Sequence, residues 1–471
     1  MKSILTKEVV SSIRDQRLAF LVIAMVLLVS TSLFMAYTQS AKTALEKQEL
    51  TEHMREQWDS LDMDAHSASH YGKYVFTPQS SLGFFDLGIS NYVGRFLKVE
   101  AHLQNDPQFS QANESSDTIR LGDLSAARLL QVLLPLLLIF MTYDTVGRER
   151  EQGTLKLLIA QGVSMRRLLW QKVIAHFLLA QLVLIPVMIA TFLFQLSGDG
   201  ISKTNDEVIR FIPLLLLYSG FSFIVICITV SVSAWLKESH NTLFSMLGVW
   251  FVFILFLPKM TANAADGFYP LPSKKEFQLA IEEEVKNGVD GHNKSDIRSK
   301  LFIDSVLTHY QVSDVNQLPI NIDGALMQAD EDYRNMVTKK NFELVKEKVY
   351  AQNYLSQRLA WLNPFLSVRD LSMSICSTDY FQHAEFEEQV QNYRIELIRT
   401  LNNYMTIHSK PGDWGSKAES SFFQSIPDFV YTQPSLRWCL TNYWLSIVAF
   451  AIWLVASICL VEWASRNTKA I

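Results

Sequence analysis

The sequence lacks the features of a soluble nucleotide hydrolase or a nucleic-acid-binding protein. No G-x-x-x-x-G-K-[ST] motif occurs, and the nearest fragment, Gly415–Ser416–Lys417, has neither the upstream glycine nor a preceding strand. The net charge is −5, which gives no basic excess for binding nucleic acid. Only four cysteines occur, most of them in or beside apolar runs, so no disulfide framework is expected. If this protein works with ATP, the ATPase is another chain.

Internal repeats and low-complexity tracts are also missing, and the composition is apolar. Hydrophobic residues make up 49% of the chain and charged residues 19%, with a mean hydropathy of +0.11. No cleavable signal is expected, because the first apolar run, from Leu18, is long and no A-x-A site follows it. The composition therefore predicts a membrane protein with large water-exposed parts.

Six apolar runs are long enough, or nearly so, to cross about 30 Å of hydrocarbon as helices of about 20 residues. Pro135 and Pro186 lie inside the second and third runs, where neighbouring helices can satisfy the freed carbonyl groups. The fifth run is the shortest and is expected to stop at Pro258–Lys259. The predicted spans are residues 18–38, 124–146, 168–196, 211–235, 242–259 and 439–463.

Basic segments at the ends of these spans predict the topology, because Lys and Arg near span ends resist translocation. Segment 147–172 carries six cations and two anions. The N-terminal residues, the turn at Lys237 and the tail 464–471 fall on the same side when six spans alternate. Both termini are therefore predicted to be cytosolic, in a multi-pass protein of the bacterial cytoplasmic (inner) membrane.

The first 17 residues are predicted to form an amphipathic helix on the cytosolic surface, and the alternative is an ordinary soluble helix start. Its apolar residues fall on one helical face, with cations elsewhere. These apolar residues are Ile4, Leu5, Val9, Val10 and Ile13.

Two large segments, 39–123 and 260–438, are left for the extracytoplasmic side. Much of the second is predicted to be helical, from apolar residues at three- and four-residue spacing in 276–287, about 324–362 and 385–405. Breaks are expected at Asn363–Pro364 and Pro411–Gly412, and residues 71–98 read as loops and short elements. The predicted fold class is thus an all-α membrane protein with six transmembrane helices, an N-terminal amphipathic helix and a large, mainly helical extracytoplasmic domain.

The cytosolic loop 147–167 has an ordered series of features between two spans. Glu149 and Glu151 precede the turn Gly153–Thr154–Leu155, and an apolar patch follows up to Ile159. Gly162 and Ser164 are then expected to restart a short helix, with Ser164 as its N-cap. On charge alone the segment is equally a solvated loop, but the order of features favours a docking element under the membrane.

The pattern E-x-E-x-G-T-L-x-L-L, followed by a serine and basic residues that lead into a span, resembles the permeases of type-two ATP-binding-cassette (ABC) exporters. The resemblance implies that the loop between spans two and three is a coupling helix that rests on a separate ATPase subunit. It also implies an amphipathic helix before the first span, as in residues 1–17. The residues assigned to ATPase coupling are Glu149, Glu151, Gly153, Thr154, Leu155, Leu158, Ser164, Arg166 and Arg167.

The same resemblance implies partners and cofactors. ATP and Mg are expected on a dimer of cytosolic ABC ATPase subunits, with no cofactor in this chain. A second copy of the permease or a paralogue, membrane lipid and a periplasmic protein are the other expected partners, and nucleic acid is not expected.

A second resemblance lies in residues 363–405, which look like the extracytoplasmic insertion of one subgroup of such permeases, between spans five and six. Typical members of the wider family have small loops there, so their substrates are not transferred to this chain. The residues that carry this resemblance are a serine-rich helix, Thr378–Asp379, His383, Phe386 and the pair Tyr393–Arg394.

Three ionisable residues fall within or near the spans and are candidates for function. Asp144 and Glu462 are expected to pair with Arg148 and Arg466 at i+4 spacing, and His176 is either satisfied in helix packing or part of a proton relay.

His383 and Glu387, four residues apart, have the spacing of half a metal site. No second ligand cluster is near, so no metal is expected. The pair is instead expected to be structural, with Asp379 capping the helix.

The sequence thus predicts the permease subunit of an ABC exporter-type complex, without enzymatic activity of its own, that moves a hydrophobic or amphiphilic substrate. The alternative is mechanotransmission, in which ATP rearranges the extracytoplasmic domain and a periplasmic partner without passage of a substrate. A third possibility, an ATP-independent transporter or sensor, is disfavoured by the pattern in 147–172.

Overall fold

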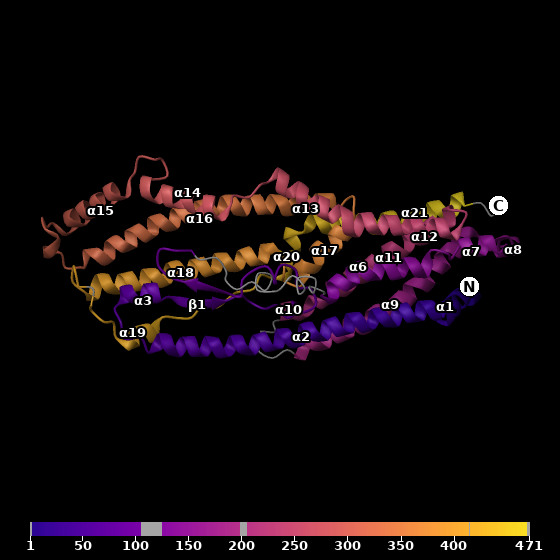
Figure 1. Cartoon of the computed structure of the whole chain (residues 1–471), viewed down its shortest axis with the longest axis horizontal. Coiled ribbons are helices and arrows are strands. Elements are labelled where there is room, and N and C mark those ends of the chain that lie inside the picture. The colour runs from indigo at the N-terminus through magenta and orange to yellow at the C-terminus, as the bar shows by residue number, and fades with distance from the viewer. Residues whose placement is uncertain (1, 105–124, 198–204, 414, 469–471) are drawn as a thin grey trace.

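The computed structural model describes residues 2–104, 125–197, 205–413 and 415–468. The molecule is elongated and mostly helical (Figure 1). Both termini lie at one end of its long axis, which we call the terminal end. The opposite end is built from residues of 39–104 and 260–438, which we call the distal domain.

Six helical segments in the described residues are long and apolar enough to span a membrane, which confirms the predicted number. They are α2 (Gln16–Asp59), α6 (Ala126–Thr142), α9 (Met165–Ser197), α11 (Phe211–Trp235), the continuous series α12 (Ser239–Trp250), η1 (Phe251–Phe256) and α13 (Leu257–Phe268), and α21 (Trp444–Asn467). Four predicted runs (18–38, 168–196, 211–235 and 242–259) fall within these helices, whereas 124–146 and 439–463 overlap α6 and α21 but extend beyond them.

Helix α2 is much longer than a membrane span. Its 44 residues extend for about 66 Å at 1.5 Å per residue, twice the thickness of the hydrocarbon core. Beyond residue 38 it is rich in Ala, Leu, Glu, Lys and Gln, which are strong helix formers. It contains no glycine or proline, which would weaken or break the helix. The first span is therefore rigidly continuous with the distal domain.

The helix that contains the fifth predicted run does not stop at Pro258–Lys259, and where the membrane span itself ends stays a prediction. The helix widens into the π-helical turn η1, whose bonds include that from the Leu257 N–H to the Val252 carbonyl. Pro258 then occupies the first turn of α13, where its missing N–H is tolerated. The helix continues to Phe268.

Within the described ranges the distal domain contains one small sheet, which corrects the all-α prediction. Strands β1 (Lys73–Phe76) and β2 (Phe96–Val99) pair antiparallel, with Lys73 opposite Val99. The helices of the two sequence segments of this domain are α3 (Ala65–Tyr71), α14 (Lys274–Asn287), α15 (Ser295–Tyr310), α16 (Ile322–Leu359), α17 (Pro364–Ile375), α18 (Tyr380–His408), α19 (Ser420–Ser425) and α20 (Leu436–Asn442), with the short 3₁₀ turn η2 (Val315–Gln317). A capping box of Ser273 and Glu276 begins α14.

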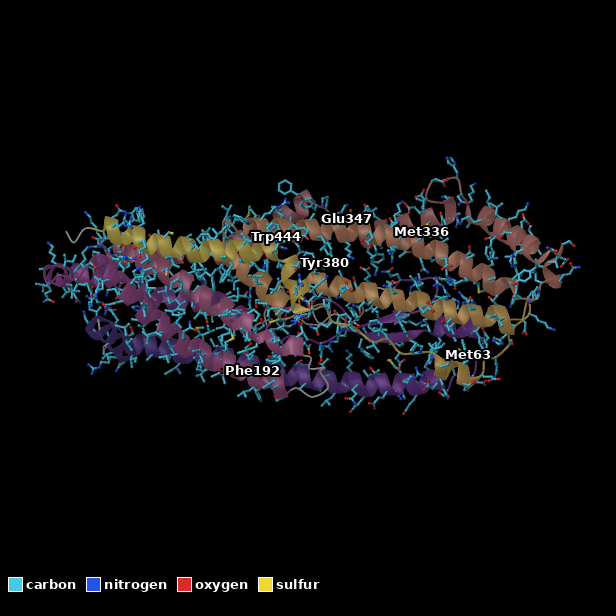
Figure 2. All side chains as sticks on the ribbon, turned by 180° about the vertical axis from the view of Figure 1, so that it is seen from behind. Met63, Phe192, Met336, Glu347, Tyr380 and Trp444 are labelled. Carbon is cyan, nitrogen blue, oxygen red and sulfur yellow. The ribbon has the colours of Figure 1, made fainter. Side chains whose placement is uncertain are left out.

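The two sequence segments of the distal domain share one hydrophobic core. Trp58 of α2 and Val75 of β1 pack in the same cluster as Phe386 and Leu401 of α18 and Phe423 of α19. Figure 2 shows Met63 near the distal end, whereas Tyr380 and Trp444 lie near the middle, where the distal domain meets the spans. The regions predicted to be helical lie in α14, α16 and α18. The break predicted at Asn363–Pro364 falls between α16 and α17, and the one predicted at Pro411–Gly412 follows α18.

Helix α17 belongs to the distal segment by sequence but to the spans by packing. Asn363 caps its N-terminus by accepting a hydrogen bond from the Phe365 N–H, as the Asn363–Pro364 break predicts. Phe365, Val368 and Leu371 are buried in the same core as α6, α9 and α11. The distal domain is therefore anchored inside the span bundle.

Candidate functional site

The predicted coupling loop forms two short helices at the terminal end, α7 (Gly147–Glu151) and α8 (Thr154–Ala160), beside α1 (Lys2–Arg14) (Figure 1). Gly153 joins them in the left-handed conformation, with φ of +72°, which few residues other than glycine adopt at low cost. The Thr154 hydroxyl donates to the Glu149 carbonyl at 3.1 Å and closes this turn.

Helix α8 has one anchored face and one exposed face. Leu155 is fully buried and Leu158 packs against the span core. Leu157 is 62% exposed and Lys156 is exposed beside it. The buried leucines therefore fix α8 to the span bundle, and its opposite face is an exposed surface of mixed apolar and basic character.

The residues after α8 do not form the separate short helix that was predicted. Ser164 does act as a cap, since its hydroxyl accepts a hydrogen bond from the Arg167 N–H at 3.4 Å. The helix that it begins is α9 itself, the third span. Arg166 and Arg167 are exposed on its first turn, next to α8 in sequence.

Glu149 does not face solvent, although the sequence placed it in an exposed loop. Its side chain is 8% exposed and lies 3.3 Å from the ammonium of Lys172 and 3.4 Å from that of Lys7. The Lys172 side chain is 1% exposed and also binds Glu8 of α1 at 2.8 Å. We call Glu8, Glu149 and Lys172 the buried charge cluster.

The sequence reasoning counted Lys172 only as a loop cation and missed Glu8. One signal was available: Lys172 follows Leu168 and Leu169 by four and three residues, so it shares a helix face with two leucines. A buried ammonium needs a carboxylate partner. The cluster joins α1, α7 and α9.

Arg150 and Glu151 attach α7 to the fourth and fifth span helices, α11 and α12. The guanidinium of Arg150 donates to the carbonyls of Ala234, at 2.7 Å, and Leu236, at the end of α11. Glu151 accepts a hydrogen bond from the Ser239 N–H at 2.7 Å and thereby caps the start of α12. The two residues hold the connection between α11 and α12 against the loop.

The other intramembrane candidates have structural partners. Asp144 pairs with Arg148 as predicted. The buried His176 donates from Nδ1 to the Lys172 carbonyl at 2.8 Å, which agrees with the packing interpretation. Glu462 was expected to pair with Arg466, but its carboxylate binds the Arg166 guanidinium at 2.9 Å and the Trp170 indole N–H at 2.8 Å. This pair joins α21 to the start of α9.

At the other end of the spans, Arg210 connects α11 to the distal domain. Its side chain is fully buried and donates to the Ser377 hydroxyl at 2.9 Å and to the Pro434 carbonyl at 2.6 Å. It also pairs with Asp206 at 3.1 Å, and that carboxylate accepts from the Leu436 N–H at the start of α20. Sequence reasoning missed Arg210.

A second polar chain crosses the same boundary. Gln131 of α6 donates to the Tyr218 hydroxyl of α11 at 3.0 Å, and Tyr218 lies 3.0 Å from the Ser372 hydroxyl of α17. Ser372 in turn donates to Asp86. Burial raises the pKa of Asp86, and the hydrogen bond from Ser372 opposes that shift. Two spans and two distal segments thus meet in one network.

The residues of the second resemblance gather where α17 meets α18. Asp379 caps α18 by accepting from the N–H groups of Phe381 and Gln382, as predicted. His383 and Glu387 pair at 3.2 Å. No group of three or more His, Cys, Asp and Glu residues in the described ranges is arranged to hold a metal ion.

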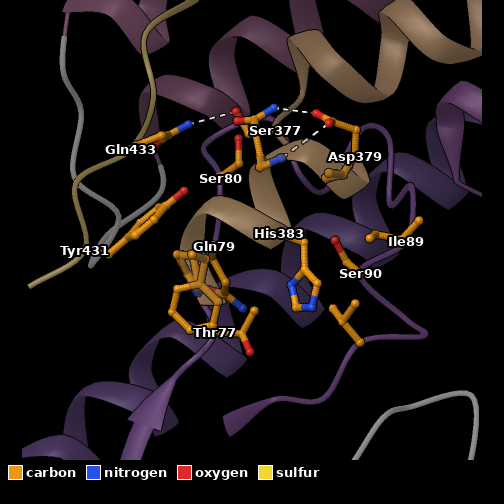
Figure 3. A pocket seen from close by; sticks show the side chains of 15 residues that line it. Thr77, Gln79, Ser80, Ile89, Ser90, Ser377, Asp379, His383, Tyr431 and Gln433 are labelled. Carbon is orange, nitrogen blue, oxygen red and sulfur yellow. Dashed lines mark hydrogen bonds between the residues drawn. The ribbon is translucent and has the colours of Figure 1, made fainter. Parts of the chain in front are cut away.

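A small cavity of about 50 Å³ lies beside this junction. In Figure 3, His383 and Tyr431 face it from opposite sides, and Gln433 bonds to Ser377 above it. The lining joins residues of 77–93 to residues of 377–386 and 431–433 in the larger distal segment. Burial raises the pKa of Asp379, and the hydrogen bonds that its carboxyl accepts from the helix N–H groups and from the Gln382 amide oppose that shift.

The comparison with protein families decides the identity of this architecture. Residues 2–464 match the family described as "ABC-2 family transporter protein". The chain is a member of the ABC-2 transporter family. A comparison with curated proteins found no match.

Membership confirms several predictions. ABC-2 permeases lack an ATPase domain and pair with ATPase subunits, which agrees with the missing nucleotide motif. The protein is an ABC transporter permease and a multi-pass membrane protein with six candidate spans.

Proposed function

We propose that the exposed face of α8, together with Arg166 and Arg167, receives the ATPase subunits of this ABC-2 permease. Four features support this: Lys156 and Leu157 are exposed, Leu155 holds the helix from below, both termini lie at the same end, and the loop is basic. This end is cytosolic and the distal domain is extracytoplasmic in the proposed topology, with both termini inside. ATP and Mg are bound by the partner dimer.

The roles of the two glutamates follow from their contacts. Glu149 acts through the buried charge cluster, and Glu151 acts through the cap of α12. Neither carboxylate is a contact for the ATPase in this proposal. Movement of α8 is instead transferred to α1 and α9 by Lys172, and to α11 and α12 by Arg150 and Glu151.

The connection between spans and distal domain carries the second part of the proposal. Because Arg210 and α17 tie the outer end of the bundle to the distal domain, movement of α11 cannot leave that domain unchanged without breaking buried hydrogen bonds. The distal domain therefore responds to the ATPase cycle. This observation favours mechanotransmission as a component of the function.

Export of a hydrophobic or amphiphilic substrate completes the proposed role, since the chain belongs to a transporter family. The span faces of α2 and of α12–η1 are exposed and apolar, at Phe20, Leu27, Phe244 and Phe251 for example. Membrane lipid and a second permease copy or a paralogue would cover them. Both the export and the mechanotransmission modes use the same receiving surface.

The receiving surface is tested by Leu157→Asp in the complex with its ATPase subunits. The matched control is Leu301→Asp in α15, because Leu301 has the same 62% exposure at the far end of the molecule. Loss of apolar contact and a buried charge should lower co-purification of the ATPase and its stimulation about tenfold in the first variant only. Equal ATPase binding and stimulation in wild type and Leu157→Asp would show that α8 is not the receiving element.

A further inference from the structure

A second cavity, of about 190 Å³, lies in the distal domain between α2, β1 and the segment 428–431. It is larger than the cavity of Figure 3 and lies on the membrane-distal part of α2, beyond the predicted span. Its walls are largely aromatic. They include Trp58, Tyr71, Tyr74, Tyr393, Phe429 and Tyr431.

Three cations stand in this wall, and two of them are neutralised. Lys73 pairs with Asp428 and lies 5.0 Å from the centre of the Trp58 ring. Arg55 pairs with Asp59 at 2.9 Å and with the same Asp428 at 3.3 Å. The charges of Lys73 and Arg55 are therefore balanced by the carboxylates of Asp59 and Asp428.

Lys47 is the third cation, and it has no carboxylate partner among the described residues. Its ammonium donates to the Thr77 carbonyl at 3.3 Å, and its side chain is partly buried. Neutral carbonyl contacts compensate an ammonium less well than an anion does. The cavity therefore has one uncompensated positive charge beside aromatic walls.

We propose that this cavity binds a small organic carboxylate with an aromatic or apolar, ring-sized body. One excess positive charge matches a monoanion, and Lys47 is placed to bind its carboxylate. The rings of Tyr74 and Phe429 pack against the body. Because the cavity spans α2, β1 and the segment after α19, a bound ligand holds these elements together. The proposed site is separate from the ATPase-receiving surface and does not depend on it.

The test uses the full-length permease in lipid nanodiscs without ATPase subunits, with benzoate as the probe. Binding is measured by isothermal titration and by saturation-transfer NMR, and benzamide is the neutral probe of the same shape. Benzoate should bind at least about tenfold more tightly than benzamide, since the difference is one charge-assisted contact. Equal binding of the two probes, or none by benzoate, would overturn the proposal.

Two variants examine the site itself. Lys47→Met should weaken benzoate at least about tenfold and leave benzamide unchanged. Thr51→Trp fills the cavity from the same helix and should abolish binding of both probes.

The control is Lys42→Met, which removes an exposed cation of α2 that pairs with Glu46 outside the cavity. Its benzoate affinity should equal that of wild type. A similar loss in Lys42→Met and Lys47→Met would show that only general surface charge attracts the probe, and would contradict the proposal. If Lys47→Met does not fold, the comparison of probes in wild type and in Thr51→Trp still decides.

Discussion

Replacing Lys172 by methionine should release helix α1 from the membrane-facing bundle. The wild-type ammonium lies 2.8 Å from Glu8 and 3.3 Å from Glu149, and its side chain is 1% exposed. Methionine fills similar space but leaves the two nearly buried carboxylates facing each other, with only the largely exposed Lys7 still 3.4 Å from Glu149. Removing one partner of a buried ion pair costs about 3–5 kcal/mol.

That cost need not unfold the protein, because α1 can lift away and let Glu8 reach water. The Ile4 and Val9 contacts that hold α1 to the bundle are only partly buried, so they oppose this opening weakly. A loss of about 3 kcal/mol in the free energy of local opening corresponds to amide exchange that is about 100-fold faster. The stimulation of the ATPase should fall as well, since α1 no longer braces α7.

Hydrogen–deuterium exchange of the α1 peptides in nanodiscs measures this opening directly. Lys156→Met, at an exposed position of α8, serves as the matched control and should exchange as wild type does. Adding Glu8→Gln to Lys172→Met should restore part of the protection, because one of the two stranded charges is removed. If exchange in Lys172→Met stays within about threefold of wild type, the cluster does not hold α1 and the reasoning fails.

Two further outcomes are expected. Arg210→Lys keeps the charge but loses the planar guanidinium that reaches both Ser377 and Pro434. Spin labels at positions 45 and 301 should therefore lose their ATP-dependent change in distance, while ATPase stimulation stays within about twofold of wild type. A distance change equal to that of wild type would show that Arg210 does not transmit the movement. Burial raises the pKa of Glu331, but the His102 hydrogen bond and the Arg394 charge outweigh it and hold that pKa below its usual value. Its stabilising contribution is therefore complete above about pH 4.3 and is lost as the pH falls through the lower folded pKa. Thermal unfolding from pH 7 to pH 3 should show wild type and Glu331→Gln converging at the acid end, and a constant gap would contradict this sign.

Much of the fold could be predicted because its causes are local. A run of apolar residues such as 211–235 becomes a span whatever surrounds it, since a helix satisfies its own backbone in hydrocarbon. Ser164, Asn363 and Asp379 act as caps through bonds to N–H groups two or three residues away. These signals need no knowledge of distant segments.

The misses have identifiable physical reasons. Proline was taken to end the fifth helix at 258, but a π-helical turn just before it accommodates the ring and the missing donor. Each strand of the β1–β2 pair has four residues, too few for a clear alternating pattern. The i+4 spacing predicted that Glu462 pairs with Arg466, but α9 packs beside α21 and Glu462 binds Arg166 and Trp170 instead.

The candidate coupling site shows the same division. The order of glutamates, glycine and leucines marked the loop from sequence, and Leu155 and Leu157 were both within the predicted patch. Which leucine is buried and which is exposed depends on how α8 rests on the bundle. The ATPase-coupling roles of these residues stay predictions until Leu157→Asp is measured.

By itself, the sequence determined the number of spans, the helix breaks near residues 363 and 411, the lack of a nucleotide motif and the family. These properties follow from hydropathy, propensity and motifs within short stretches of chain. Only the tertiary structure decided that Lys172 joins Glu8 to Glu149, and that Arg210 ties α11 to residues 377 and 434. It also decided that Lys47 has no carboxylate partner among the residues that the structure describes. A buried charge takes whichever partner the packing of distant helices brings within about 4 Å, and no local pattern encodes that choice.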